Sequence, residues 1–123
     1  LVVLREKVAH WCAIPADRFV HALIAEYRPG TPLGWHRDVP GFELIAGVSL
    51  LGSCRLRLRP YPWSPQKRSE RLFVELAPRS VYVLRGEARW KWQHSVPPVK
   101  ELRYSITLRT RRWEHTRSEG VPL

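Results

Sequence analysis

The chain has 123 residues, of which 44% are hydrophobic and 26% charged, which is enough for one packed domain and excludes a disordered chain. No apolar run approaches the length that spans a membrane. The 21 Lys and Arg outnumber the 11 Asp and Glu, for a net charge of +10, which favours a polyanionic partner such as nucleic acid, although an Arg-rich chain can also reflect genomic base composition.

The first predicted element is a helix. Leu4, Val8 and Trp11 recur at helical spacing, so we expect a short amphipathic helix over residues 4–12, ended by Pro15 and Asp17. The helical period does not return strongly after this point, which argues against an α/β fold.

The sequence pattern of the rest of the chain is typical of a β protein. Short runs of β-branched and aromatic residues alternate with turns rich in Pro and Gly. We predict eight strands, over residues 19–27, 33–37, 44–51, 55–59, 72–76, 81–85, 90–95 and 102–110. The segment 60–69, with three prolines, is expected to be a surface loop. Strands of this number and spacing predict an all-β sandwich or jelly roll in a single domain.

The two cysteines, Cys12 and Cys54, have no CxxC or zinc-ligand spacing. The chain begins with Leu1 and shows no signal-peptide pattern. We therefore expect a reduced, cytoplasmic protein that is not bound to a membrane and acts as a monomer.

His36 and Asp38 form the most informative pair in the sequence. Residues two apart on an extended strand project from the same face. An imidazole and a carboxylate on one face supply two of the three ligands of the 2-His-1-carboxylate site that holds non-haem Fe(II). A single His-x-Asp is common by chance, so the surrounding residues decide its meaning.

The last predicted strand alternates strictly. Arg103, Ser105, Thr107 and Arg109 share one face, and apolar or aromatic residues occupy the other. This pattern fits a half-buried strand with a solvated outer face. Taken alone, the pattern favours that interpretation, but it also fits a polar face that points into a cavity, where the arginines would require anionic partners such as a dicarboxylate.

The ordered set of motifs resembles the AlkB family of Fe(II)/2-oxoglutarate-dependent dioxygenases. The resemblance runs from Tyr27 to Arg109. Its elements are Tyr27-Arg28-Pro29-Gly30, Trp35-His36-Arg37-Asp38, Gly47-Val48-Ser49-Leu50, Gly86-Glu87-Ala88-Arg89, His94 and Arg103-x-Ser105-x-Thr107-x-Arg109. It implies a double-stranded β-helix, which is a jelly roll, over a catalytic domain of residues 1–123.

The resemblance also implies roles for individual residues. The ligands of Fe(II) would be His36, Asp38 and His94. Arg103 would pair with the distal carboxylate of 2-oxoglutarate, with help from Tyr27 and Ser105. Arg109 would lie near the cosubstrate and the substrate mouth. Together with O₂, these cofactors would hydroxylate N-methyl groups, which then leave as formaldehyde.

The sequence departs from the repair members of that family in three places. Ala25 stands where they usually have Asn, which removes one hydrogen bond to 2-oxoglutarate. Val39-Pro40 replaces an acidic residue that follows the metal aspartate and touches the damaged base. We also expect the N-terminal nucleotide-recognition lid to be short or missing.

The leading functional hypothesis is oxidative demethylation of alkylated bases in DNA or RNA, with single strands preferred. Arg55, Arg57 and Arg59 share a strand face and would form a basic rim that tracks phosphates, with Trp35 near the target base. A solvated basic face is the alternative for these arginines. Two other functions remain open: the same iron chemistry on a protein or small molecule, and a non-catalytic basic domain that binds nucleic acid.

Overall fold

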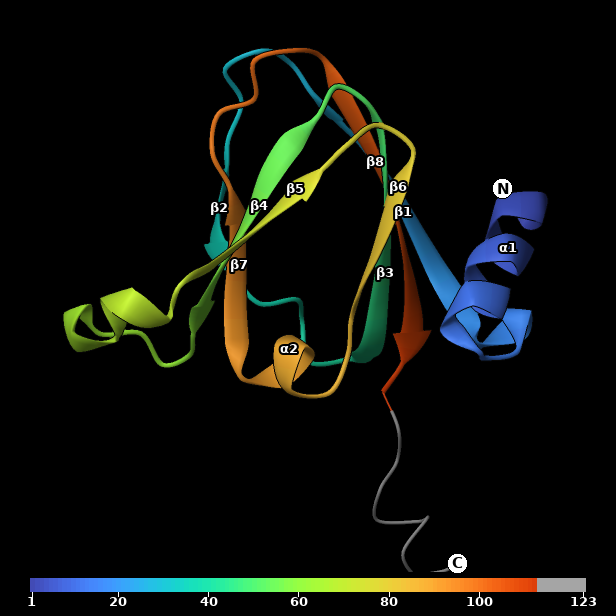
Figure 1. Cartoon of the computed structure of the whole chain (residues 1–123). Coiled ribbons are helices and arrows are strands. Elements are labelled where there is room, and N and C mark those ends of the chain that lie inside the picture. Colours follow the sequence, from blue (N-terminus) through green and yellow to red (C-terminus); the bar gives the residue numbers. More distant parts are fainter. Residues whose placement is uncertain (113–123) are drawn as a thin grey trace, which may run out of the picture.

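The computed structural model, described over residues 1–112, is a sandwich of two antiparallel four-stranded sheets that face each other (Figure 1). One sheet has the strand order β1-β8-β3-β6 and the other the order β2-β7-β4-β5. The strands are β1 (Phe19–Tyr27), β2 (Leu33–His36), β3 (Phe42–Leu51), β4 (Cys54–Pro60), β5 (Leu72–Leu76), β6 (Ser80–Leu84), β7 (Trp92–Val96) and β8 (Arg103–Arg111). The predicted all-β jelly-roll fold is confirmed.

Four short helical segments accompany the sheets: α1 (Val2–Cys12), η1 (Ala16–Arg18), η2 (Pro65–Glu70) and α2 (Glu87–Trp90). Helix α1 lies against the outside of the β1-β8-β3-β6 sheet (Figure 1). It ends where Ala13 adopts the left-handed conformation, at φ 61°. Its buried residues Val8, Ala9 and Cys12 pack with apolar side chains of the sheet to form the first core.

Alternation along β3 explains how the sheet serves two cores. Leu44, Ala46 and Val48 belong to the core under α1, whereas Ile45, on the opposite face, lines the cavity between the sheets. A second core inside the sandwich comes mainly from the other sheet: Cys54, Leu56, Leu76, Val96 and Val99. The interior between the sheets is therefore partly apolar and partly polar.

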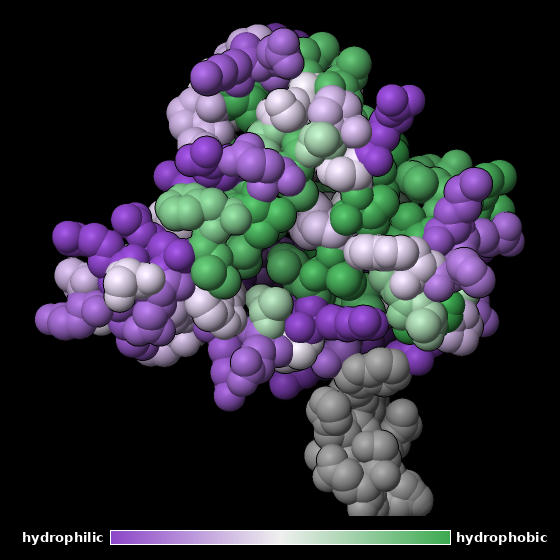
Figure 2. Space-filling model, in the orientation of Figure 1, coloured by the Kyte–Doolittle hydropathy of each residue, from purple (hydrophilic) through white to green (hydrophobic). Residues whose placement is uncertain are grey.

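The surface divides in a similar way. Figure 2 shows hydrophobic side chains gathered over the middle of the face where β5 and β6 lie, and hydrophilic ones over the η2 segment. The exposed hydrophobic residues of β5 are Leu72, Phe73 and Val74. Strand β5 is an edge strand of its sheet, so this apolar strip lies at the rim of the sandwich.

Two predicted elements differ from the structure. The strand expected over residues 90–95 starts only at Trp92, because Gly86 adopts φ +61° and begins the helical turn α2, which includes Trp90. The loop expected over residues 60–69 contains the 3₁₀ helix η2, which begins at Pro65. The remaining predicted elements match within two residues.

Within residues 1–112, no helix is both long enough and apolar enough to cross a membrane. In the same part of the chain, Cys12 and Cys54 are buried free thiols.

Candidate metal and cosubstrate site

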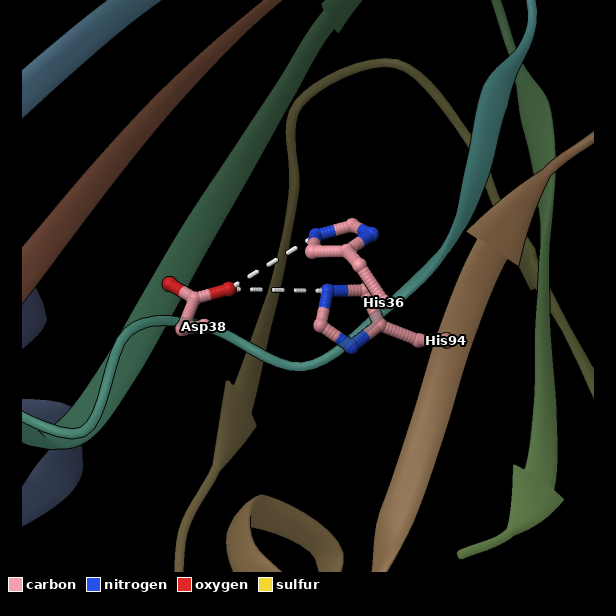
Figure 3. Close-up of side chains that lie close together, drawn as sticks. All are labelled: His36, Asp38 and His94. Atoms are coloured by element: carbon pink, nitrogen blue, oxygen red, sulfur yellow. Dashed lines mark ion pairs between the residues drawn. The ribbon is translucent and has the colours of Figure 1, made fainter. Parts of the chain in front are cut away.

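The three predicted iron ligands converge between the two sheets (Figure 3). His36 is the last residue of β2, Asp38 follows two positions later, and His94 lies directly across from His36 on β7. Asp38 Oδ1 lies 3.7 Å from His36 Nε2 and 3.8 Å from His94 Nε2. Within the described residues, this is the group of His, Cys, Asp and Glu side chains arranged to hold a metal ion.

The surroundings of both imidazoles suit a metal ligand. His36 Nδ1 lies 2.8 Å from the carbonyl oxygen of Gly34, to which it donates, and Nε2 faces Asp38 at the metal position. Burial, and then the neighbouring His36, lowers the pKa of His94 to about 4. His94 is therefore neutral at physiological pH, the form that binds metal.

Asp38 is held by an arginine on its other side. Arg109 Nε donates to Asp38 Oδ2 over 2.9 Å, while Oδ1 faces the two histidines. One carboxylate oxygen of Asp38 thus accepts from the guanidinium of Arg109, and the other faces the metal position. Arg109 was predicted near the cosubstrate and the substrate mouth. It does line the cavity, but its direct partner is the metal ligand Asp38.

A second arginine supports the backbone around the aspartate. Arg89 is 3% exposed and donates to three carbonyl oxygens, those of Asp38 (3.2 Å), Val39 (2.7 Å) and Phe42 (3.0 Å). Its guanidinium also lies over the ring of Trp90, 4.0 Å from the centroid. Arg89 therefore ties the chain that follows the metal aspartate to the helical turn α2.

Arg103, the predicted anchor for 2-oxoglutarate, is a buried cation that forms no ion pair with an acidic residue of the described part of the chain. It is 3% exposed, and its Nε donates to the hydroxyl of Ser49 at 3.0 Å. Its guanidinium carbon lies 5.3 Å from the centre of the Tyr27 ring. Among the ion pairs of residues 1–112, none involves Arg103. A buried guanidinium of this kind is matched to a carboxylate that arrives from outside.

One cavity of about 130 Å³ connects the metal position with Arg103. The alternating face of β8 points into it, so the cavity interpretation of that strand holds and the solvated-face interpretation does not. Ala25 also lines the cavity, at the position where the resemblance led us to expect Asn. The lining polar and charged residues are Tyr27, His36, Asp38, Tyr82, His94, Arg103, Ser105, Thr107 and Arg109.

The four residues predicted to contact substrate lie elsewhere. Arg57 and Arg59 lie over the ring of Trp35, at 5.1 and 4.2 Å from its centroid, and Arg55 pairs with Glu75 at 2.6 Å. None of these side chains lines the metal cavity. In an extended strand, the alternation that points His36 inward points Trp35 outward. Trp35 therefore lies outside the cavity, and its expected place near a target base stays a prediction.

Three contributors had no role assigned from the sequence. Ser49 and Arg89 belong to the family motifs, but only the fold shows what they contact. Ser49 accepts a hydrogen bond from Arg103, and Arg89 donates to the backbone carbonyl of Asp38. Tyr82 had no sequence signal of its own. It lies against Gly47, where any β-carbon would overlap the Tyr82 ring, and burial raises the pKa of Tyr82 to about 12. Gly47, in the Gly47-Val48-Ser49 motif, is the sequence feature that indicates a side chain packed closely against β3.

The donor set fits Fe(II). Two imidazole nitrogens and one carboxylate oxygen lie within 4.8 Å of one another. Two ligands at right angles on a first-row metal are about 3 Å apart when each bond is about 2.1 Å, so small side-chain rotations suffice to place all three on one ion. Three protein ligands leave positions for a chelating 2-oxo acid and O₂, and Arg103 at the same cavity matches its distal carboxylate.

Comparison with known proteins agrees with this geometry. Residues 1–116 match the family model described as the 2OG-Fe(II) oxygenase superfamily. An uncharacterized protein, L905, of Acanthamoeba polyphaga mimivirus is 30% identical over an alignment of 100 residues that covers 71% of this chain and 46% of that protein. An "Alkylated DNA repair protein ALKBH8 homolog" of Arabidopsis thaliana is 34% identical over an alignment of 91 residues that covers 63% of this chain and 26% of that protein. The chain thus spans less than half the length of these curated relatives.

Solved structures with the same fold include a prolyl hydroxylase and a cupin domain. A Pseudomonas putida prolyl-4-hydroxylase has a TM-score of 0.55 at 22% identity, over 75% of this chain and 50% of that one. The Schizosaccharomyces pombe Cnp3 cupin domain has a TM-score of 0.55 at 10% identity, over 81% of this chain and 58% of that one. These likenesses concern the fold alone. The family match over nearly the whole chain, together with the His36, Asp38 and His94 geometry, shows that this chain belongs to the 2OG-Fe(II) oxygenase superfamily.

Proposed function

We propose that this chain is an AlkB-like dioxygenase that removes N-methyl groups from bases in single-stranded DNA or RNA. The observation that carries the iron chemistry is one cavity that holds both the His-Asp-His group and the buried Arg103, which forms no ion pair within residues 1–112. The choice of substrate is supported by the net charge of +10 and by the similarity to the Arabidopsis protein named as an alkylated DNA repair protein.

The residues of the chain divide the work of such a reaction. When bound, Fe(II) and 2-oxoglutarate supply the oxidation: O₂ is consumed, 2-oxoglutarate becomes succinate and CO₂, and one oxygen atom enters a substrate C–H bond. Arg103 holds the cosubstrate carboxylate in one orientation, and Arg109 fixes the carboxylate of Asp38. A methyl group on nitrogen becomes N–CH₂OH, which releases formaldehyde and restores the N–H.

Single strands are the favoured form of the substrate. A base must leave the helical stack before its methyl group enters a cavity between two sheets, and extraction from a duplex costs a few kcal/mol. A single strand avoids most of that cost. Leu33 and His36 of β2, an edge strand of four residues, line the cavity, and we infer that a base enters past this short strand.

The test is formaldehyde release from N-methylated oligonucleotides, measured with Fe(II), 2-oxoglutarate and O₂. We expect release from single strands to exceed that from matched duplexes. Succinate formation without added substrate is measured in parallel, because it reports on the iron chemistry alone. Succinate without formaldehyde from any methylated strand would defeat the nucleic-acid assignment and favour a protein or small-molecule substrate. The absence of both would favour a non-catalytic binding domain.

A further inference from the structure

Outside the catalytic cavity, the outer face of the β2-β7-β4-β5 sheet carries stacked arginine and aromatic side chains. The guanidinium of Arg59 lies over two indole rings, 4.2 Å from the centroid of Trp35 and 4.9 Å from that of Trp63. Arg57 lies over the Trp35 ring at 5.1 Å. We call these four residues the arginine–tryptophan surface. Both indoles are partly exposed, so the stack is accessible from solvent.

A second stack continues the arginine–tryptophan surface along both strands. Arg37 and Tyr61 lie two positions beyond Trp35 and Arg59, and the Arg37 guanidinium lies 3.7 Å from the centre of the Tyr61 ring. The Tyr61 side chain is among the exposed aromatic groups, at 43%. Charged and aromatic groups therefore alternate across two neighbouring stacks on this side of the molecule.

The two arginines of the surface are fixed in place by their Nε groups. Arg57 donates to the hydroxyl of Ser95 and Arg59 to the side-chain oxygen of Gln93, each over 2.9 Å. These bonds and the indole rings hold the guanidinium planes before any ligand arrives. Among the side-chain hydrogen bonds of residues 1–112, none uses the terminal nitrogens of Arg57 or Arg59, which therefore remain available as donors.

The charge of this surface is not balanced by acids. Within residues 1–112, neither Arg57 nor Arg59 belongs to an ion pair, whereas Arg55, on the same strand, pairs with Glu75 at 2.6 Å. Burial, followed by the like charges of Arg57 and Arg71, lowers the pKa of Arg59. The neighbouring η2 segment contains Lys67 and Arg68, and Figure 2 shows hydrophilic side chains over it. An anion bound here would relieve the repulsion between these cations.

The alternation of arginines and aromatic rings indicates which class of anion this surface binds. A single strand of nucleic acid alternates phosphates with bases, and proteins bind it through basic grooves and aromatic rings on which bases stack. Guanidinium groups also stack on bases through their planar faces. An acidic peptide would satisfy the charges but would leave the tryptophan rings without comparable partners. The combination therefore favours a single-stranded nucleic acid.

We propose that the arginine–tryptophan surface is a docking platform for single-stranded nucleic acid, separate from the catalytic cavity. This inference rests on the proposed function, because demethylation of single strands is the reason for the protein to bind them. Strand β2 is the edge of its sheet, with Trp35 on the outer face and His36 on the inner one. A strand held on the platform therefore passes around one sheet edge to bring a neighbouring base to the cavity.

The platform is tested by the affinity of metal-free protein for a fluorescent single-stranded oligonucleotide, measured by anisotropy over a range of salt concentrations. We expect Arg57→Gln/Arg59→Gln to weaken binding at least about tenfold. The slope of log affinity against log salt should fall in magnitude by about 1.4, because each phosphate contact to a single strand contributes about 0.7. Trp35→Leu should weaken binding about tenfold while leaving the salt slope unchanged, because it removes stacking and no charge.

The matched control is Arg28→Gln/Arg55→Gln, which removes the same two charges from arginines that already pair with Glu26 and Glu75. It should bind within about twofold of the unaltered chain. Thermal unfolding of each variant verifies that the fold is kept. A strand of the same length without bases serves as a second probe, and it should bind at least about tenfold more weakly than the strand with bases.

Two results would overturn the platform: equal losses in the control and the Arg57/Arg59 variant, or equal affinity for strands with and without bases. Equal losses would mean that only net charge matters. Equal affinity would mean that a polyanion, not a base-bearing strand, is the partner. Because the assay uses no metal or cosubstrate, its outcome is independent of formaldehyde release. Platform binding without demethylation would reject the proposed function alone, and demethylation without platform binding would reject the platform alone.

Discussion

Arg103 and Arg109 are identical side chains on one face of β8, and their surroundings give them different tasks. Arg109 donates to the carboxylate of Asp38, so its charge is already matched. Arg103 donates to the neutral hydroxyl of Ser49, and no carboxylate of residues 1–112 forms an ion pair with it. The strand pattern placed both arginines on the cavity face. Only the positions of their partners distinguish Arg103, the proposed cosubstrate anchor, from Arg109, which holds the candidate metal ligand Asp38.

Replacing Arg103 with Lys tests the anchor. Lysine keeps the positive charge but cannot form the two parallel hydrogen bonds that a guanidinium offers a carboxylate. We expect the concentration of 2-oxoglutarate that gives half-maximal succinate formation to rise at least about tenfold, which corresponds to a loss of about 1.4 kcal/mol. Arg28→Lys, at an exposed position outside the cavity, is the control. An unchanged requirement for 2-oxoglutarate in Arg103→Lys would place the anchor elsewhere.

Arg89 is expected to position the metal aspartate through the backbone. Arg89→Met keeps much of the side-chain volume but removes the donors to the carbonyls of Asp38, Val39 and Phe42. Residues that orient metal ligands typically contribute about 10- to 100-fold to metal affinity. We expect anaerobic titration with Co(II) to show a loss in that range, with partial recovery in Arg89→Lys. A variant that unfolds at lower temperature but binds Co(II) with unchanged affinity would show a purely structural role.

At the scale of elements, Gly47 lets β3 and β6 pack closely. It pairs with Tyr82 across the two strands, and any β-carbon at Gly47 would overlap the Tyr82 ring. Gly47→Ala is therefore expected to lower the free energy of unfolding by about 1–3 kcal/mol, the typical cost of overpacking. Urea unfolding measures this change. Gly34→Ala is the matched control in β2, because a β-carbon there meets open space.

A second variant tests whether the overlap with Tyr82 is the cause of the loss in Gly47→Ala. Tyr82→Leu removes the ring that the new β-carbon would meet, so Gly47→Ala should cost less in the Tyr82→Leu background than in the original chain. The same cost in both backgrounds would mean that the overlap with Tyr82 is not the cause. In that case, the loss would come from the backbone of β3 itself.

Much of the fold was predictable from the sequence because strands repeat every two residues. Alternation identified the polar face of β8, and turn residues marked most strand ends. The strand prediction failed at Trp90, where the left-handed Gly86 starts a helical turn that hydrophobic pattern alone does not reveal. Alternation with His36 also predicts the outward position of Trp35, because neighbouring residues of a strand point to opposite faces.

The site was less predictable because it depends on side chains from distant parts of the chain. Arg103 meets Ser49 across β8 and β3, and Arg89 reaches the carbonyl of Asp38 from 51 residues away. Nothing in the local sequence of Ser49 indicates its partner. The metal ligands were predictable only because the resemblance joined His94 to the His36 and Asp38 pair.

At the scale of the whole molecule, the two outer sheet faces are used differently. Helix α1 covers one face and builds an apolar core beneath it. The outer face of the other sheet carries the arginine–tryptophan surface. The interior holds the metal group, and the two cores flank it. This division places a charged exterior next to the cavity that holds the His36, Asp38 and His94 group.

The burial of His94 should make the stability of the metal-free protein sensitive to acid. The pKa of His94 is about 4 in the folded chain against 6.5 for an ordinary histidine, so below pH 6.5 the unfolded chain takes up a proton that the folded chain does not. Stability therefore falls as the pH drops from 6.5 toward 4. With a chelator present, urea unfolding at pH 7 and pH 4.5 should show a loss on the order of 2 kcal/mol larger than in His94→Gln. Equal losses in both proteins would show that His94 is not the group responsible.

The most direct test of the central claim is the visible charge-transfer absorption that forms when Fe(II) and 2-oxoglutarate bind together without O₂. The account predicts a band that saturates at one Fe(II) per chain and disappears in Asp38→Asn, which removes the charge of the carboxylate between the two histidines. His10→Asn, at an exposed position on α1, should leave the band unchanged. A band of undiminished intensity and affinity in Asp38→Asn would contradict the assignment of His36, Asp38 and His94 as the iron site.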